Sequence, residues 1–134
     1  MILVDINVIM YAAGAPHPHK VPSITLLEQV ATGAIEAVID AEVLQEILHR
    51  YRAIHRWDEG KQVYDLARQL FPLVVPVTAE ILDRARHLLD ADAQIMARDA
   101  LHAAVVMQEG LEAVCSYDQD FDRIKGLVRR EPGA

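Results

Sequence analysis

The 134-residue chain contains few cysteines and few aromatic residues. Cys115 is the single cysteine, which excludes an internal disulfide and any zinc or redox motif built on a cysteine pair, so we expect a reducing cytoplasm. Aromatic residues are 5% and hydrophobic residues 52%, so the core must be aliphatic. No apolar run approaches roughly 18 residues and no basic residues precede the apolar N-terminus, so we expect neither a membrane span nor a signal peptide.

Positive charge is also in short supply. Lys and Arg number 13 against 20 Asp and Glu, for a net charge of −7, and both signs are spread along the chain. This pattern excludes a polybasic nucleic-acid-binding arm and a disordered acidic tail. A polyanion can bind such a protein only where a local basic patch or bound cations reverse the field. The length predicts a single domain, residues 1–134, with a core over about 1–126 and a short edge strand and tail over 127–134.

Hydrophobic periodicity predicts short strands that alternate with helices. We expect strands over residues 2–4, 36–39, 72–76 and 112–116 and from 128. We expect helices from near residue 5, over 24–31, 41–55 and 58–70, from 78, and over 98–108. Residues 14–22 carry three prolines and a glycine, which predicts a loop with Ser23 as the following N-cap, and Asp40 is expected to cap the next helix. The alternation indicates an α/β fold with a parallel sheet.

Acidic residues follow two of the predicted strands and lie on two of the predicted helices. Asp5 and Asp118 come just after strands, where ligands bind in open α/β sheets. Glu46 and Asp99 lie on helices, and carboxylates that converge in one pocket repel one another unless a cation holds them ionised. Carboxylate ligands select hard cations such as Mg²⁺ or Mn²⁺, which act on phosphates. A structural alternative stays open for each acid: an N-cap at Asp5, a helix-dipole partner at Asp99, and an ion pair of Glu46 with Arg50.

Four segments together make the sequence recognisable: VDINVIMYA, EVLQEILHRY, ARDALHAAVVMQEGLEAVCSYDQDFDRI and GLVRREP. In this order they resemble the PIN-domain family, and within it the VapC toxins of type II toxin–antitoxin pairs. The resemblance implies a three-layer α/β/α sandwich with a short central parallel sheet of four to five strands. It also implies an endoribonuclease that uses Mg²⁺ or Mn²⁺ to hydrolyse RNA.

The resemblance assigns roles to individual residues. Its metal-binding and catalytic acids fall on Asp5, Glu46, Asp99 and Asp118. Asn7 is the polar companion of the first acid, and Ser116 takes the small hydroxyl position that contacts substrate. Some members use an additional acid, for which Asp120 and Asp122 both qualify, and we favour Asp122 as a further metal ligand.

Cationic residues near the predicted acids are candidates for RNA binding. Residues 49–56 contain three arginines, two histidines and no acid, and Arg50 and Arg98 are preferred because they adjoin Glu46 and Asp99. The alternative is that these arginines only solubilise a helix face. His102 follows Asp99 by one helical turn and is expected to be a partly buried histidine with a local hydrogen bond rather than a substrate contact.

The expected partners follow from the resemblance. They are an RNA substrate, a cognate VapB-like antitoxin and a second copy of the chain in a homodimer, with no membrane. Leu66, Leu70 and Phe71 are either part of such an interface or part of the core. The alternative function is a catalytically silent PIN-like module that binds an antitoxin or RNA. A haloacid-dehalogenase-like phosphatase is disfavoured because Asn7 stands where its second aspartate is needed.

Overall fold

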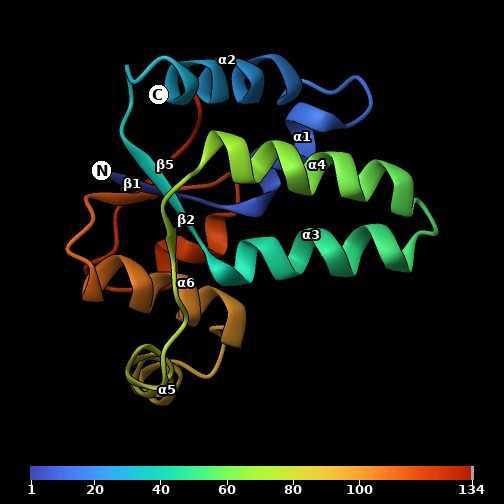
Figure 1. Cartoon of the computed structure of the whole chain (residues 1–134). Coiled ribbons are helices and arrows are strands. Elements are labelled where there is room, and N and C mark those ends of the chain that lie inside the picture. Colours follow the sequence, from blue (N-terminus) through green and yellow to red (C-terminus); the bar gives the residue numbers. More distant parts are fainter. Residues whose placement is uncertain (134) are drawn as a thin grey trace.

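The computed structural model describes residues 1–133, which contain a five-stranded sheet (Figure 1). The strands are β1 (Ile2–Val4), β2 (Ala37–Asp40), β3 (Val74–Val75), β4 (Ala113–Cys115) and β5 (Arg129–Arg130). Their order is β3-β2-β1-β4-β5, and every pairing is parallel. The predicted parallel sheet is therefore confirmed; of the predicted C-terminal tail, residue 134 lies outside the described residues.

Helices cover both faces of the sheet. They are α1 (Ile6–Ala13), α2 (Lys20–Ala31), α3 (Ala41–Ala53), α4 (Trp57–Leu70), α5 (Ala79–Ala91) and α6 (Ala97–Gln108), with a short 3₁₀ helix η1 (Gln119–Arg123). One core cluster joins the sheet to α1, α2, α3 and α4, and a second joins it to α5, α6 and η1. In Figure 1, α5 and α6 lie on the opposite side of the sheet from α3 and α4. The predicted three-layer α/β/α sandwich is confirmed.

The core is aliphatic, as the composition predicts, with one phenylalanine in each of its two halves. Phe71 is fully buried in the half formed with α1 to α4, and Phe121 is fully buried in the half formed with α5 and α6. Cys115 is buried as well, and burial raises the pKa of its thiol to about 12, so it is a small core residue and not a nucleophile. Within residues 1–133, no helix combines the length and apolar character needed to cross a bilayer.

Side-chain caps begin three of the α-helices: α1 and α3 directly after strands, and α5, where the Thr78 hydroxyl accepts from Ile81 N at 3.3 Å, after a loop. The carboxylate of Asp40 accepts a hydrogen bond from Val43 N at 3.1 Å and caps α3, as predicted. Asp5 accepts from Ile6 N at 2.8 Å at the start of α1. Each cap satisfies an amide that the helix leaves unpaired, so the chain turns directly from strand into helix at β1 and β2.

The start of α2 differs from the prediction. The helix begins at Lys20, so its first turn includes Pro22, which the sequence pattern had placed in a loop. Proline is tolerated there because the first turn of a helix needs no amide donor. Ser23 is consequently not an N-cap. It is buried, and its hydroxyl lies 2.8 Å from the Tyr117 hydroxyl, which ties α2 to the segment after β4.

Candidate metal centre

The carboxyl ends of β1 and β4 bring the first group of polar side chains together. Val4 pairs with Cys115 in the parallel register, so the next residues, Asp5 and Ser116, lie side by side. The Ser116 hydroxyl donates to Asp5 Oδ2 at 2.7 Å. It accepts in turn from Asn7 Nδ2 at 2.9 Å and from Asp118 N at 3.0 Å. Ser116 is therefore a fully bonded junction between Asp5, Asn7 and Asp118, and is itself completely buried.

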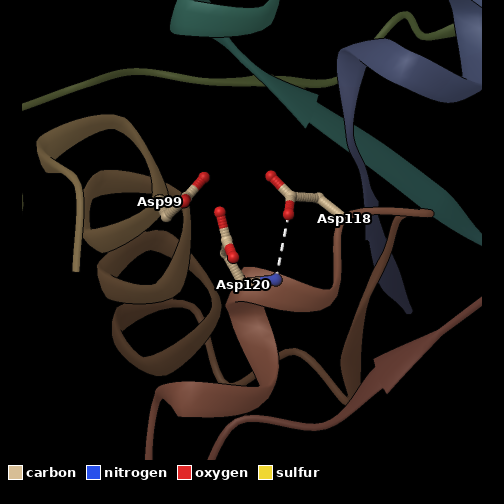
Figure 2. Close-up of side chains that lie close together, drawn as sticks. All are labelled: Asp99, Asp118 and Asp120. Atoms are coloured by element: carbon tan, nitrogen blue, oxygen red, sulfur yellow. Dashed lines mark hydrogen bonds between the residues drawn. The ribbon is translucent and has the colours of Figure 1, made fainter. Parts of the chain in front are cut away.

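Three carboxylates gather beside this junction (Figure 2). Oxygen atoms of Asp99, Asp118 and Asp120 lie within 4.8 Å of one another. Asp99 comes from the first turn of α6, while Asp118 and Asp120 come from the start of η1, where Asp118 Oδ1 accepts from Asp120 N at 2.9 Å. They border a surface cavity of about 580 Å³. The arrangement leaves carboxylate oxygens facing a space large enough for an ion and a substrate phosphate.

The electrostatics of this group are unfavourable without a cation. Burial, followed by the charges of Asp118 and Asp5, raises the pKa of Asp99 from 3.8 to about 6. Desolvation and like charges both disfavour the ionised form, so the site gains most from a positive charge placed between the carboxylates. An all-oxygen donor set suits a hard divalent cation. The residues present therefore fit the metal that the sequence implied.

Glu46 lies apart from this group of three. Its side chain is almost fully buried, and one oxygen forms an ion pair with Arg98. Its other oxygen lies 3.9 Å from Arg50 Nε and has no hydrogen-bond partner among the described residues. The structure thus places both predicted RNA-binding arginines on the carboxylate of Glu46, with about half of each arginine side chain exposed.

The structure also separates the two candidates for the additional acid. Both oxygens of Asp122 accept from Arg129, Oδ1 from Nε at 3.0 Å and Oδ2 from Nη2 at 3.2 Å. Asp120, not Asp122, lies with Asp99 and Asp118. The preference for Asp122 therefore does not agree with the geometry, because side-chain directions in a 3₁₀ turn do not follow from spacing alone. The Asp118-Gln119-Asp120 spacing, typical of an Asx turn, is the signal that favours Asp120.

A buried histidine and a buried aspartate lie behind Asp5. His102 is fully buried in α6, and its Nδ1 lies 2.6 Å from Oδ2 of Asp40. The burial is more complete than the partial burial expected, and the hydrogen bond is not local, since Asp40 ends β2. Burial acts to lower the pKa of His102, but the hydrogen bond and charge of Asp40, with the charges of Asp5 and Glu46, outweigh it and raise that pKa.

Comparison with known proteins agrees with this geometry. A family model of the PIN domain matches residues 2–127. The chain belongs to the PIN-domain family. It is 41% identical over 129 residues to Ribonuclease VapC13 of Mycobacterium tuberculosis, and the match covers 96% of this chain and 98% of that relative. The resemblance to VapC toxins stated from the sequence is thereby confirmed.

Solved PIN-fold structures superpose over almost the whole chain. VapBC2 from Rickettsia felis, crystallised with a DNA fragment from its promoter, matches with a TM-score of 0.76 and 19% identity, covering 98% of each chain. VapC20 of Mycobacterium tuberculosis, a toxin that cleaves the sarcin-ricin loop, matches with a TM-score of 0.76 and 17% identity over 96% of this chain and 97% of that one. At these identities the likeness establishes the fold.

Proposed function

We propose that this protein is a VapC-type endoribonuclease, carried by a single PIN domain, that hydrolyses RNA with Mg²⁺ or Mn²⁺ as cofactor. The observation that carries the proposal is the group formed by Asp99, Asp118 and Asp120, in which burial and then neighbouring negative charge raise the pKa of Asp99 to about 6. A surface that only bound RNA would gain nothing from three adjoining carboxylates, because they repel phosphate. The 41% identity to VapC13, a ribonuclease, supports the same activity here.

The metal would be held by Asp5, Asp99 and Asp118, with Asp120 adjoining them. A divalent cation at this position supplies positive charge to the scissile phosphate and lowers the pKa of a water molecule. Ser116 and Asn7 keep Asp5 and the Asp118 backbone in register through their hydrogen bonds. We propose Asp120 in place of Asp122 as the additional acid, because Asp122 is engaged by Arg129.

Arg50 and Arg98 are proposed to contact RNA phosphates at the rim of the site. Both arginine side chains are about half exposed beside the buried Glu46, so a phosphate can approach them without opening the core. They provide local positive charge in a chain of net charge −7, which RNA binding needs. Glu46 would hold these arginines in place beside the acidic centre.

A cognate antitoxin is the proposed partner, since a solved structure of the same fold, with a TM-score of 0.70, is a toxin–antitoxin complex from Klebsiella pneumoniae. An apolar groove of about 170 Å³ lies between α1, α2 and α4. Leu66, 62% exposed, and Phe71, fully buried, both line it, so this surface is partly interface and partly core. We propose that an apolar antitoxin segment occupies the groove, and that the toxin works in the cytoplasm as a homodimer.

The activity is tested by incubating purified protein with total RNA and Mn²⁺ or Mg²⁺, with and without chelator. The variant is Asp99→Asn, and its matched control is Asp83→Asn, the same substitution at an exposed position of α5. Discrete fragments that need metal, persist in Asp83→Asn and disappear in Asp99→Asn are the expected result. Equal cleavage by wild type and Asp99→Asn would assign the activity to a contaminant. Absence of RNA cleavage by the wild type would favour the alternative of a PIN-like module that binds without catalysis.

A further inference from the structure

One imidazole ring in the core lies between two buried carboxylates. His102 is 1% exposed, and its two ring nitrogens face different acids. Nδ1 lies 2.6 Å from Asp40 Oδ2, and Nε2 lies 3.9 Å from Asp5 Oδ1. Nε2 has no hydrogen-bond partner in residues 1–133, although buried polar atoms are almost always paired. The unpaired Nε2 therefore lies next to Asp5, one of the proposed metal ligands.

Asp40 is held rigidly on its own side of the ring. It is 0% exposed, and its Oδ1 accepts from Val43 N, so one oxygen caps α3 while the other bonds His102. A carboxylate only accepts hydrogen bonds, so the ring presents Nδ1–H to Asp40. The ring is thereby fixed with Nε2 toward Asp5, and because Asp5 is a carboxylate too, the ring suits both neighbours when each of its nitrogens carries hydrogen. Asp40 is outside the residue set implied by the family resemblance, so nothing so far gives it a part in the reaction.

Asp5 has fixed partners on its other sides. Its Oδ1 accepts from Ile6 N at the start of α1, and its Oδ2 accepts from Ser116 at 2.7 Å. His102 reaches it from α6, the helix that also carries Asp99 three residues earlier. The imidazole therefore links the acid at the end of β1 to the helix that supplies the next acid. A displacement of α6 or of the end of β1 would therefore be transmitted to the other through this ring.

We propose that Asp40 and His102 are positioning residues for the metal centre, with the Nε2 side of His102 fixing the Asp5 carboxylate in its ligating orientation. This inference rests on the proposed function and deepens it. Neither residue touches the ion or the RNA. Partners of this kind behind a metal ligand typically change metal affinity by 10–100-fold when they are removed. Their effect falls on ion binding rather than on the RNA contacts at Arg50 and Arg98.

Two conservative variants of His102 separate this role from a structural one. In His102→Gln the amide nitrogen reaches the position of Nε2 and keeps a donor toward Asp5. In His102→Asn the amide nitrogen takes the position of Nδ1 and keeps the donor toward Asp40 instead. The measurements are Mn²⁺ affinity by isothermal titration calorimetry of the full chain and the denaturant midpoint of the metal-free protein. Affinity reports on Asp5, whereas the midpoint reports on the buried bond to Asp40.

We expect the two variants to rank in opposite orders for Mn²⁺ affinity and for the unfolding midpoint. His102→Gln should bind Mn²⁺ within a few-fold of wild type and His102→Asn should bind it at least about 10-fold more weakly, while His102→Asn keeps the higher unfolding midpoint. If Mn²⁺ affinity instead follows the midpoint, or both variants bind like wild type, the pair is merely structural and the inference is overturned. Absence of Mn²⁺ binding by the wild type overturns the proposed metal-dependent function together with this inference.

A second measurement needs no variant. Pulsed electron paramagnetic resonance of Mn²⁺ in the wild-type protein detects nitrogen bonded directly to the ion. We expect no such coupling, because Nε2 acts on Asp5 and not on the metal. A strong nitrogen coupling would make His102 a ligand and overturn the positioning role, even where the variants do not fold.

Discussion

The two halves of the acidic centre differ in how the protein holds them. Asp5 is 7% exposed, and both of its oxygens accept hydrogen bonds, from Ile6 N and from Ser116. Asp99, Asp118 and Asp120 are more exposed, and within this second group the only carboxylate bond among the described residues is Asp118 Oδ1 to Asp120 N. We call Asp5 with its partners the anchored half and the group of three the open half.

Because of this difference, the fold itself stabilises one half of the site, whereas the other half is stabilised only by a bound positive charge. The anchored half carries its own hydrogen-bond donors, so its carboxylate is stabilised whether or not an ion is present. The open half offers charge without partners, and its repulsion is relieved only from outside the chain. The protein therefore pre-arranges one proposed ligand, Asp5, and leaves the other three carboxylates in a state that would favour metal binding at the expense of metal-free stability.

The largest expected effect is on catalysis and is shared by both halves. Asp5→Asn and Asp99→Asn should each reduce metal-dependent RNA cleavage at least about 100-fold, because loss of a charged ligand removes several kcal/mol of transition-state stabilisation. Initial rates on one labelled RNA at saturating Mn²⁺ measure this, with Asp83→Asn as the matched control. Cleavage within a few-fold of wild type in either variant would remove that residue from the metal centre.

The same two variants should have opposite effects on stability. An asparagine at position 5 directs its amide nitrogen at either Ser116 or Ile6 N, so one hydrogen-bond donor always faces another. The free energy of unfolding should therefore fall by about 1–2 kcal/mol. Asp99→Asn removes a repelled charge and should make unfolding about 1 kcal/mol harder at pH 7 without metal, after allowance for solvent screening. Urea denaturation in chelator measures both. Equal destabilisation by the two substitutions would abolish the distinction between the halves.

Sequence patterns predicted the fold and the anchored half better than the open half. Asp5 and Ser116 follow adjacent parallel strands, so strand ends alone bring them together. Spacing alone does not identify the additional acid, because Asp122 pairs with Arg129 whereas Asp120 lies with the open half. No local pattern joins Asp40 to His102, since 62 residues separate them. Only the packing of α6 against the sheet makes that pair.

The start of α2 illustrates a different limit of sequence patterns. Prolines in residues 14–22 predict a loop, but Pro22 is compatible with a first helical turn, so composition does not determine which side of the boundary it occupies. The consequence reaches the site. Because Ser23 lies inside the helix and bonds Tyr117, α2 helps to hold the segment that leads to Asp118.

The open half also predicts a pH dependence of stability. The pKa of Asp99 is about 6 in the folded protein against 3.8 for an unperturbed aspartate, so the folded state binds this proton more tightly. Its contribution to stability is complete below pH 3.8 and is lost as the pH rises through about 6. The difference in unfolding free energy between wild type and Asp99→Asn, measured in chelator, should therefore change across that window. A difference that stays constant with pH would mean that the carboxyl is not perturbed.

The smallest effects are expected at the two acids of η1. Asp120 adjoins the open half but is exposed, so Asp120→Asn should weaken Mn²⁺ binding by about fivefold, the equivalent of a charge interaction of about 1 kcal/mol at a solvated site. Asp122→Asn should leave Mn²⁺ binding unchanged and lower the unfolding free energy by no more than about 1 kcal/mol, because Asp122 is about half exposed and Arg129 keeps its contacts with Glu131 and the Ser116 carbonyl.

Calorimetric titration of the two variants side by side decides between the acids, since they carry the same substitution two positions apart. Weaker binding in Asp122→Asn alone would return the additional ligand to Asp122 and require Arg129 to release it when the ion binds. Such a result would extend the open half to β5, the strand that carries Arg129, and the contrast with Asp5 would grow. Weaker binding in Asp120→Asn alone would confine the open half to α6 and the first turn of η1, where the free carboxylates already lie together.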